Sequence, residues 1–578
     1  VPEDVGIVPT IVKGDIFAGC QQQSGESSSG STGDSSAAGG ASSGGGTGEI
    51  ETIEFYGFGQ NPSNAFFQWQ QDYFAEKIGV NVTIIPADNE KLQTMLSAGN
   101  LPDMGTYAVN GDLSQAIQGG HLMDLTPYED QIPNYTEKWP ESVQFSKDYK
   151  SAGTGKLYGL IGQLGTYNAY ALDVGTYAVK VRWDIYEKVG CPEVTDMYSL
   201  LDAAEKMKEV YPKTADGLET YMFGNFPSWD GLTMSNTGRY QNVTGIMTTN
   251  IGYNFYDLVN DKIDPILSKD GSYYQALKWM ATANQRGLLD PDSMTQTYDN
   301  TQAKYKESEQ YYIALPGNFV EGYNTEANNN AEEPKGLMPL IWDGQYPVTQ
   351  AKTTKIGGHA NNPYSISSTT EKLDACLKFC NLLFDEDALM VMYGGPQGEL
   401  WDIKDGKYVL TEGAETFRTT GSYTFSTGES SSDWWGNWGL AASTSPSNYP
   451  DATLRITDSV MYAEKNIENN KIYDMYEKFY GKRRPIQVLE EYDTIYYIPE
   501  WTRLIETIPT ELEDIQNNVK GVVTQYSWQI VMNAKNDAEV EKMFDQMVAE
   551  CEELGVQKVV DWGEEQINKA KEAIKKYE

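Results

Sequence analysis

The chain has 578 residues, of which 40% are hydrophobic and 12% aromatic, so it is long enough for several globular domains. Its 83 acidic and 44 basic residues give a formal net charge of -39, which repels nucleic acids and anionic lipid headgroups and excludes them as partners. No run of eighteen or more apolar residues predicts a membrane-spanning helix. With five cysteines, an odd number, and only two histidines, we expect no disulfide framework, no metal and no cofactor.

The first 49 residues differ from the rest in composition. Residues 24–48 are almost wholly Ser, Gly, Ala and Thr, which cannot bury enough apolar surface to fold, so they predict a flexible tether. Just before them, residues 18–20 (AGC) resemble the lipobox of bacterial lipoproteins, whose cysteine is diacylated. The resemblance implies a lipid on Cys20 and anchoring at the outer face of the cell membrane, in a Gram-positive bacterium. Residues 1–49 are then a leader remnant and a tether, although 1–16 lack the continuous apolar stretch of a signal peptide.

Regular elements begin abruptly after the tether. Alternating and β-branched stretches predict three strands, and apolar residues at helical spacing predict two helices between them. In chain order these elements are 52–56, 64–77, 80–85, 91–98 and 104–109. Their β-α-β-α-β order predicts a parallel sheet, whose ligands lie at the carboxyl ends of the strands. The polar candidates in the loops at those ends are Gln60, Asn61, Asn110 and Asp112.

Two later helices matter for the cysteines and for one candidate site. A helix at 372–384 carries Cys376 and Cys380, which we expect to be buried thiols because the chain has few histidines to complete a metal site. A second helix is expected at 504–515, directly after Trp501 and Arg503.

Seven short motifs follow one another in the order and spacing typical of family 1 extracellular solute-binding proteins of bacterial ABC importers. They are 99–104 (GNLPDM), 120–128 (GHLMDLTPY), 155–160 (GKLYGL), 181–184 (VRWD), 287–291 (GLLDP), 365–386 and 393–408. The resemblance covers about residues 50–578 and implies the carbohydrate-type lipoproteins of that family. It implies an α/β, two-lobe periplasmic-binding-protein-like fold (type II-like), with hinged lobes and a central cleft.

The same resemblance implies where the chain crosses between the lobes. Crossings are expected near 162–170, 357–362 and 430–440. Lobe 1 is then 50–166 plus 357–430, and lobe 2 is 167–356 plus 431–578. Such a protein captures its ligand in the cleft between the lobes and delivers it to the permease subunits of the ABC transporter.

A sugar ligand requires two kinds of side chain. Its C–H faces stack on aromatic rings, and its hydroxyl groups bond with amides, carboxylates or guanidinium groups. We therefore expect ligand contacts where an aromatic residue lies beside such a polar group, with core packing as the alternative for each ring. These candidates are Trp434, Trp435 and Trp438, Trp229 and Asp230, Trp342 and Asp343, Tyr167 and Asn168, and Trp501 and Arg503.

The aromatic content favours an oligosaccharide as the ligand. A peptide or an acidic sugar stays an alternative; the adjacent pair Arg483-Arg484 fits an anionic sugar as well as a carboxylate of the protein itself. A glycoside hydrolase is the enzymatic alternative, but the chain has no nucleophile elbow, zinc-protease motif, phosphate loop or dinucleotide fingerprint. We expect a monomeric binding protein and no enzyme, with a sugar and permease subunits as partners and membrane contact only through the lipid.

Overall fold

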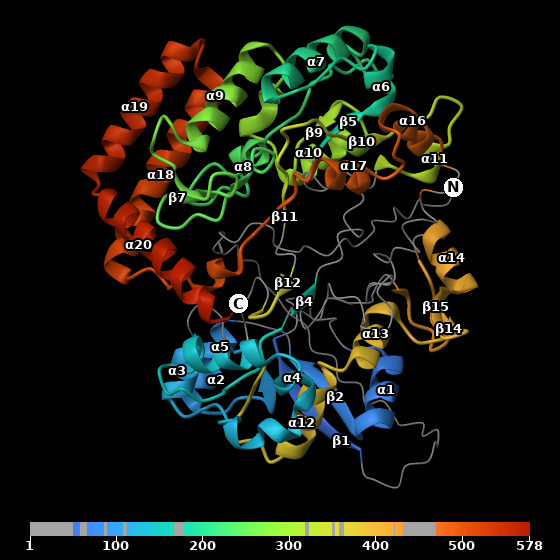
Figure 1. Cartoon of the computed structure of the whole chain (residues 1–578), viewed down its shortest axis with the longest axis vertical. Coiled ribbons are helices and arrows are strands. Elements are labelled where there is room, and N and C mark those ends of the chain that lie inside the picture. The colour runs from blue at the N-terminus through green and yellow to red at the C-terminus, as the bar shows by residue number, and fades with distance from the viewer. Residues whose placement is uncertain are drawn as a thin grey trace, which may run out of the picture.

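A computed structural model describes residues 50–57, 66–85, 89–107, 112–162, 164–166, 178–317, 323–349, 353–357, 363–420, 422–431, 467 and 470–577. The elements in these ranges form two groups, drawn one below the other in Figure 1. The first group contains the N-terminal elements and those of residues 363–420. The second group contains the elements of 178–349 and most of the C-terminal helices.

The first group is built on a four-stranded sheet of order β13-β3-β1-β2. β1 (Glu51–Tyr56) pairs in parallel with β2 (Val80–Ile85) and with β3 (Met104–Gly105), as the β-α-β-α-β pattern predicts. Of the described part of the expected third strand, 104–107, the first two residues form β3. β13 (Ser365–Ile366) joins β3 in antiparallel orientation, so the chain returns to this sheet after building much of the second group.

Two helices pack together against this sheet through aromatic side chains. α1 (Gln68–Ile78) begins later than the predicted residue 64, and α12 (Leu373–Leu382) lies within the predicted 372–384. Phe74 of α1 and Phe379 of α12 meet edge to face with ring centroids 5.3 Å apart, and Phe379 also contacts Phe55 of β1 in this way. These contacts fix both helices on the sheet.

Cys376 and Cys380 of α12 are buried in the same core. Burial raises the pKa of both thiols above the usual value, which keeps them protonated and unreactive at neutral pH. They are therefore packing residues, as predicted.

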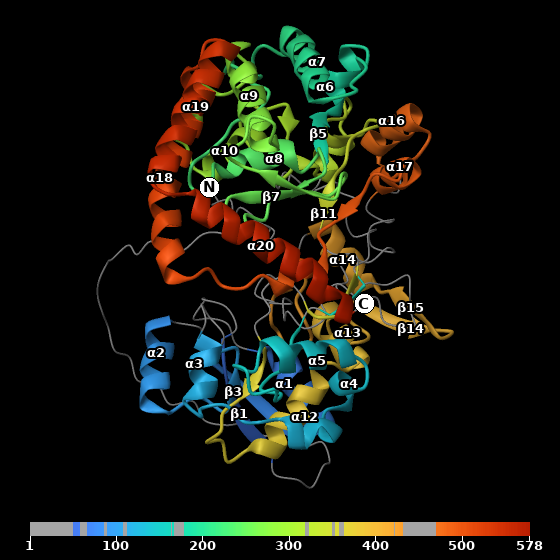
Figure 2. The ribbon, with the colours of Figure 1, turned by 60° about the vertical axis from the view of Figure 1, so that its left-hand side comes forward.

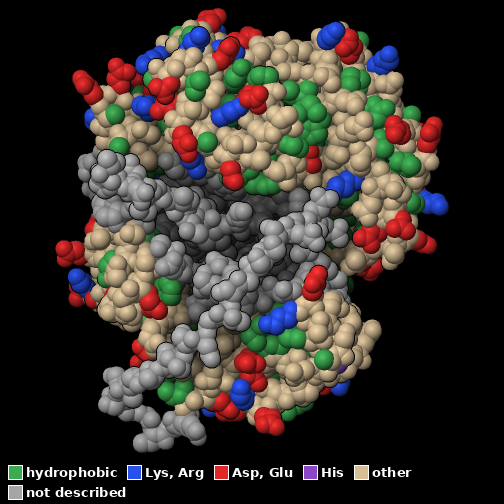
Figure 3. Space-filling view, turned by 180° about the vertical axis from the view of Figure 1, so that it is seen from behind, with side chains coloured by type: hydrophobic (Ala, Val, Ile, Leu, Met, Phe, Trp, Pro, Cys, Tyr) green, Lys and Arg blue, Asp and Glu red, His purple; other side chains and the backbone are tan. Residues whose placement is uncertain are grey.

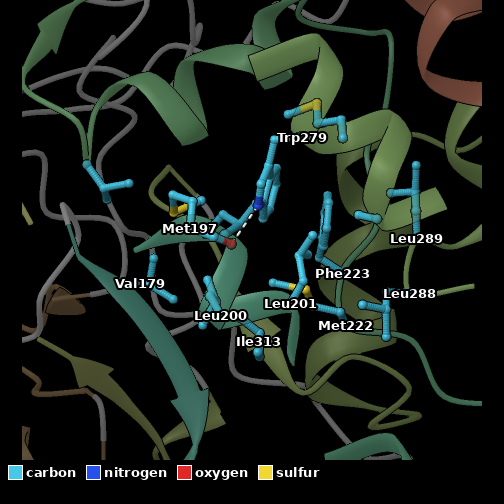
Figure 4. Close-up of a cluster of buried hydrophobic side chains, with 14 of the residues drawn as sticks. Val179, Met197, Leu200, Leu201, Met222, Phe223, Trp279, Leu288, Leu289 and Ile313 are labelled. Carbon is cyan, nitrogen blue, oxygen red and sulfur yellow. Dashed lines mark hydrogen bonds between the residues drawn. The ribbon is translucent and has the colours of Figure 1, made fainter. Parts of the chain in front are cut away.

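The centre of the second group is a three-stranded sheet of order β10-β5-β9. β5 (Val179–Arg182) is buried along its whole length and pairs antiparallel with β10 (Leu337–Leu340) and β9 (Ile313–Ala314). In the core beside it, Trp279 of α9 (Ser272–Gln285) stacks on Phe223 with centroids 5.6 Å apart (Figure 4). Its indole N–H donates to the carbonyl oxygen of Met197, the first residue of α7 (Met197–Val210), at 2.7 Å, which fixes α9 against α7.

The remaining elements complete the two groups. Those that precede β10 are α2 (Asn89–Ala98), α3 (Asp112–Gln118), η1 (Thr126–Gln131), α4 (Pro133–Thr136), α5 (Pro140–Tyr149), β4 (Gly165–Thr166), α6 (Trp183–Lys188), η3 (Ser235–Thr237), α8 (Gly238–Gln241), β6 (Ile246–Met247), β7 (Asn254–Asp257), β8 (Lys262–Pro265), η4 (Pro291–Met294), α10 (Tyr298–Lys306) and α11 (Glu326–Asn329). Those that follow it are β11 (Val348–Thr349), β12 (Thr353–Thr354), α13 (Glu386–Gly394), β14 (Trp401–Lys404), β15 (Lys407–Leu410), α14 (Glu412–Thr420), α16 (Lys471–Tyr480), α17 (Pro485–Tyr492), β16 (Tyr496–Tyr497), η8 (Glu500–Leu504), α18 (Thr510–Asn533), α19 (Asp537–Glu553), α20 (Gln557–Ala573) and η9 (Ile574–Lys576).

Three long helices end the chain. α18 and α19 pack against α9 along one edge of the second group (Figure 1). α18 begins at Thr510, later than the expected residue 504, because Pro509 stands at its N-cap and cannot continue a helix from before it. Trp501 and Arg503 consequently lie in the short helix η8.

α20 runs from the second group towards the first, and the residues after it contact α5 (Figure 2). Tyr577 is only 3% exposed, and its ring meets Phe145 edge to face with centroids 5.8 Å apart. Its hydroxyl donates to a carboxylate oxygen of Asp148 at 2.6 Å, and Lys576 pairs with the same carboxylate. The end of the chain thus joins the two groups.

Replacing Tyr577 by phenylalanine should lower the free energy of unfolding by about 1–2 kcal/mol, because it removes only the hydrogen bond to the Asp148 carboxylate. The matched control is Tyr149→Phe, whose ring is 43% exposed. Urea denaturation of both variants measures the difference, and equal stability of the two would show that the Asp148 hydrogen bond contributes nothing.

Candidate ligand-binding site

Three aromatic side chains from two distant segments of the second group lie together. Trp229 stacks on Tyr298, the first residue of α10, with ring centroids 4.4 Å apart and planes inclined by 27°. Phe226 meets Trp229 at 4.9 Å and Tyr298 at 5.4 Å, both edge to face. Phe226 is buried, whereas Trp229 and Tyr298 are half-buried. We call these three residues the aromatic platform.

The local sequence fixes the half of the platform that α10 carries. Thr297 is the N-cap of α10, and its side chain accepts a hydrogen bond from the backbone N–H of Asn300 at 3.2 Å, which sets the start of the helix at Tyr298. α8 and α10 lie in the half of the second group that is nearer to the first group (Figures 1 and 2). α10, which begins with Tyr298, thus lies on the side of the second group that is nearer to the first group.

Asp230 fixes the loop that carries Trp229. One of its carboxylate oxygens accepts from the backbone N–H of Ser235 at 2.9 Å, and the other accepts from Nε1 of Trp528, in α18, at 2.6 Å. Burial raises the pKa of Asp230 to about 6, although these hydrogen bonds act in the opposite direction. Because both carboxylate oxygens accept bonds within the protein, we assign Asp230 the positioning of Trp229 rather than direct ligand contact.

Asp230 should make the protein less stable as the pH rises from about 4 to 6. Its folded-state pKa of about 6 lies above the value of about 3.9 of a free carboxyl, so the folded chain binds more protons in this window. The free energy of unfolding then falls with rising pH, by at most about 3 kcal/mol from this group. Asp230→Asn should flatten the urea-unfolding profile over this range, and the exposed Asp343→Asn should not. Identical profiles for the two variants would count against this role of Asp230.

An arginine lies behind the platform. The guanidinium carbon of Arg239, in α8, is 5.0 Å from the centroid of the Phe226 ring. Its Nη1 donates to the carbonyl oxygen of Gly224 at 3.3 Å, and the residue is only 3% exposed. Burial lowers the pKa of Arg239 to about 10, so it stays cationic at neutral pH.

Three side-chain amides near the platform keep unused hydrogen-bonding capacity. The buried Oδ1 atoms of Asn225 and Asn236 accept no hydrogen bond within the described part of the chain. Neither amide atom of Gln302, one turn after Tyr298 on α10, has such a partner there. Buried polar atoms are normally paired, so these amides mark a place where water or a ligand completes the hydrogen bonds.

Two other predicted tryptophans lie in hydrophobic cores. Trp342 and Trp501 are each 6% exposed, and Trp501 meets Tyr256 edge to face at 5.1 Å. Asp343, beside Trp342, is exposed. Arg503 is half-buried, and burial of its guanidinium group lowers its pKa to about 10. The structure does not bring these four residues to the aromatic platform, and the burial of both rings favours packing.

The adjacent arginine pair is occupied by the protein itself. Arg483 forms ion pairs with Asp474 at 2.6 Å and with Glu477 at 3.1 Å. Arg484 is buried. Of the two interpretations of this pair, docking of the protein's own carboxylates is the one that the structure supports.

Most of the other predicted residues lie outside the described ranges, so they stay predictions. They are Cys20, Gln60, Asn61, Asn110, Tyr167, Asn168, Trp434, Trp435 and Trp438. Asp112 begins α3, but its side chain is also outside the description.

No motif in the sequence points to Phe226, Tyr298, Arg239 or Gln302. Tyr298 and Gln302 are four residues apart on a helix and therefore share a face, which was the one available signal. No pattern in the sequence indicates that residues 226–229 contact the start of α10. That contact depends on the tertiary fold.

The described residues contain no group of three or more His, Cys, Asp and Glu side chains that could hold a metal ion. None of the helices in the same ranges is both long enough and apolar enough to cross a membrane.

Comparison with known proteins identifies relatives of low sequence identity. Lipoprotein LipO of Bacillus subtilis (strain 168) is 20% identical over 343 residues, which are 58% of this chain. The match spans 63% of the length of that relative.

Solved structures of similar fold cover most of the chain. An HMO binding, ABC-transporter associated solute binding protein from Bifidobacterium longum infantis ATCC 15697 matches 90% of this chain and 98% of its own, with 18% identity and a TM-score of 0.58. The S. pneumoniae ABC-transporter substrate binding protein FusA, in complex with kestose, matches 90% of this chain and 100% of its own, with 13% identity and a TM-score of 0.54. These likenesses confirm the predicted two-lobe α/β fold.

The family model described as bacterial extracellular solute-binding protein matches residues 69–398, more than half of the chain. The two-lobe fold accounts for the division of the elements into two groups. The chain belongs to the bacterial extracellular solute-binding proteins.

Proposed function

We propose that this protein captures an oligosaccharide on the aromatic platform, between its two lobes, and delivers it to the permease of an ABC importer. The observation that carries the proposal is the half-buried stack of Trp229 and Tyr298 beside buried amides with unused hydrogen-bonding capacity. Flat rings next to polar groups match the apolar faces and hydroxyl edges of a sugar.

The strength of such a site can be estimated from its parts. A sugar face that covers about 50 Å² of a ring contributes roughly 1.2 kcal/mol. Hydrogen bonds to the neutral amides beside the rings contribute about 0.5–1.5 kcal/mol each. Stacking and several hydrogen bonds are therefore both needed to exceed the free-energy cost of association.

The lobes are proposed to close around the ligand. We assign residues 50–166 plus 357–430 to lobe 1 and 167–356 plus 431–578 to lobe 2. The antiparallel pair of β4 with β12, which lies between the two groups in Figure 1, supports two adjacent crossing segments. Only a ligand that binds the closed form better than the open form shifts this hinge equilibrium. Tyr167, Asn168 and the tryptophans at 434–438 lie near the proposed crossings and are expected to complete the site.

The N-terminal segment supports a proposal about where the protein is located in the cell. We infer that Cys20 carries a lipid that anchors the monomer to the outer face of a Gram-positive cell membrane. The protein releases its ligand unchanged, as a carrier rather than an enzyme. The acidic surface, with Asp and Glu side chains spread over both lobes in Figure 3, agrees with a neutral ligand more readily than with a nucleic acid.

Titration calorimetry and thermal unfolding with a panel of neutral trisaccharides and tetrasaccharides test the function. We expect at least one to bind with a dissociation constant of about 10 μM or lower and to raise the melting temperature. Chromatography of the incubated sugar should recover it intact. If peptides bind and no sugar does, the ligand class is wrong, and a cleaved sugar would overturn the assignment as a carrier.

A further inference from the structure

Arg239 differs from the other arginines whose contacts the structure resolves. Arg182 pairs with Asp184 at 2.8 Å, and Arg286 pairs with Glu205 at 2.6 Å. Arg483 likewise has Asp474 and Glu477. Arg239 has no carboxylate partner within the described residues, and its one hydrogen bond there goes to the carbonyl oxygen of Gly224.

This arrangement leaves a buried positive charge uncompensated. A guanidinium group has five N–H donors, and its burial is costly unless an anion or several acceptors surround it. Arg239 is 3% exposed and lies over the face of Phe226, at 5.0 Å. A cation–π contact offsets only part of the cost of burying an unpaired ion. The guanidinium group therefore keeps N–H donors that an anion can use.

The guanidinium group of Arg239 lies close to the aromatic platform. Phe226 separates Arg239 from the stack, and the same ring meets both Trp229 and Tyr298. The guanidinium group is thus one ring away from the place where a sugar is proposed to stack. Asn225 directly precedes Phe226, and Asn236 lies in η3 just before α8; the free Oδ1 atom of each can accept a hydrogen bond from a hydroxyl group.

We propose that Arg239 is a specificity-determining residue that binds the carboxylate of an acidic sugar residue, such as a uronic or sialic acid, next to the sugar that stacks on the platform. This inference rests on the proposed function and names its substrate class. The two N–H groups of a guanidinium fork match the two oxygens of a carboxylate. Entry of the carboxylate requires the loop of Trp229 to move, and the hydrogen bonds that hold this loop include those of the Asp230 carboxylate with Ser235 and Trp528.

The decisive measurement compares acidic oligosaccharides with their own methyl esters, which keep the shape and remove the charge. We use trigalacturonate, glucuronic-acid-substituted xylotriose and sialyllactose, each against its ester, by titration calorimetry on the full chain. The wild-type protein should bind at least one acid tenfold or more tightly than its ester. If no acid binds better than its ester, the inference is overturned, and this comparison needs no folded variant.

Variants then test whether Arg239 causes the preference for the acid over its ester. Arg239→Gln should reduce the preference for the acid over the ester to less than twofold, and Arg239→Lys should keep part of it. Arg286→Gln, on the same lobe and paired with Glu205, should keep all of it. A preference that survives Arg239→Gln would overturn the assignment to this residue.

The outcome also separates this inference from the proposed function. Binding of neutral sugars without any preference for acids retains the oligosaccharide carrier and removes the role of Arg239. Failure of both acidic and neutral sugars to bind removes both proposals.

Discussion

Replacing Trp229 by alanine should weaken oligosaccharide binding about thirtyfold while the fold stays intact. The indole stacks on Tyr298 at 4.4 Å, so its removal takes away one ring of the platform and allows the other to change its rotamer. The lost contact with the sugar contributes roughly 1.2 kcal/mol, and the loss of orientation at Tyr298 is expected to bring the total to about 2 kcal/mol. Because Trp229 is only half-buried, the cost in stability should be smaller than for a core tryptophan.

The measurement is a calorimetric titration with the tightest sugar from the screen, together with a thermal melt. Tyr298→Ala should weaken binding to a similar extent, because the two rings act as one surface. The matched control is Tyr198→Ala, a tyrosine of the same lobe that is 38% exposed on α7 and distant from the platform in sequence. Wild-type affinity in Trp229→Ala would remove the platform from the site.

The sequence allows the first half of the fold to be predicted because its signals are local. The alternation in β1, the β-branched residues of β2 and the helical spacing of α1 and α2 lie within short windows. The sheet of the second lobe could not be predicted in this way. β5 pairs with β9 and β10, which follow more than a hundred residues later, and β9 has only two residues. Strands this short are defined by their partners rather than by their own composition.

The contacts of the site also could not be predicted from local sequence. Three local pairs of an aromatic and a charged residue look alike in the sequence: Trp229-Asp230, Trp342-Asp343, and Trp501 with Arg503 two residues later. In the structure two of these tryptophans are 6% exposed in hydrophobic cores, and only Trp229 is half-buried beside a second ring. The difference arises from segments that the sequence does not connect, such as Tyr298 and Trp528.

Asp230 shows how the platform depends on the rest of the chain. Its partner Trp528 is in α18, one of the helices that pack along the edge of lobe 2. The loop of Trp229 is therefore held by the C-terminal part of the chain, whereas Tyr298 is held by a local cap at Thr297. The two rings of the platform are thus held from different parts of the chain, so changes in α18 should reach the platform first through Trp229.

Arg182→Met should lower the free energy of unfolding by about 3–5 kcal/mol, the largest loss of stability that we expect from a single change. Arg182 ends β5, is 3% exposed and donates to both carboxylate oxygens of Asp184, at 2.8 and 2.9 Å. It also donates to Glu309 at 3.1 Å, and its guanidinium lies over the rings of Tyr211 and Tyr323. Methionine keeps most of the packing volume but leaves the carboxylates of Asp184 and Glu309 without this cation.

Urea denaturation, followed by circular dichroism and by tryptophan fluorescence, measures the loss. Arg286→Met is the matched control, because Arg286 also contacts two carboxylates, Asp202 and Glu205, but near the surface, where such pairs contribute about 1 kcal/mol or less. Adding Asp184→Leu to Arg182→Met should restore part of the stability, since it removes one of the carboxylates left behind. Equal losses for Arg182→Met and Arg286→Met would show that burial adds nothing to the Arg182 pair. A gain from the second substitution would instead show that most of the cost comes from the orphaned carboxylate of Asp184, which is the same physical argument that makes the unpaired Arg239 a site for an anion.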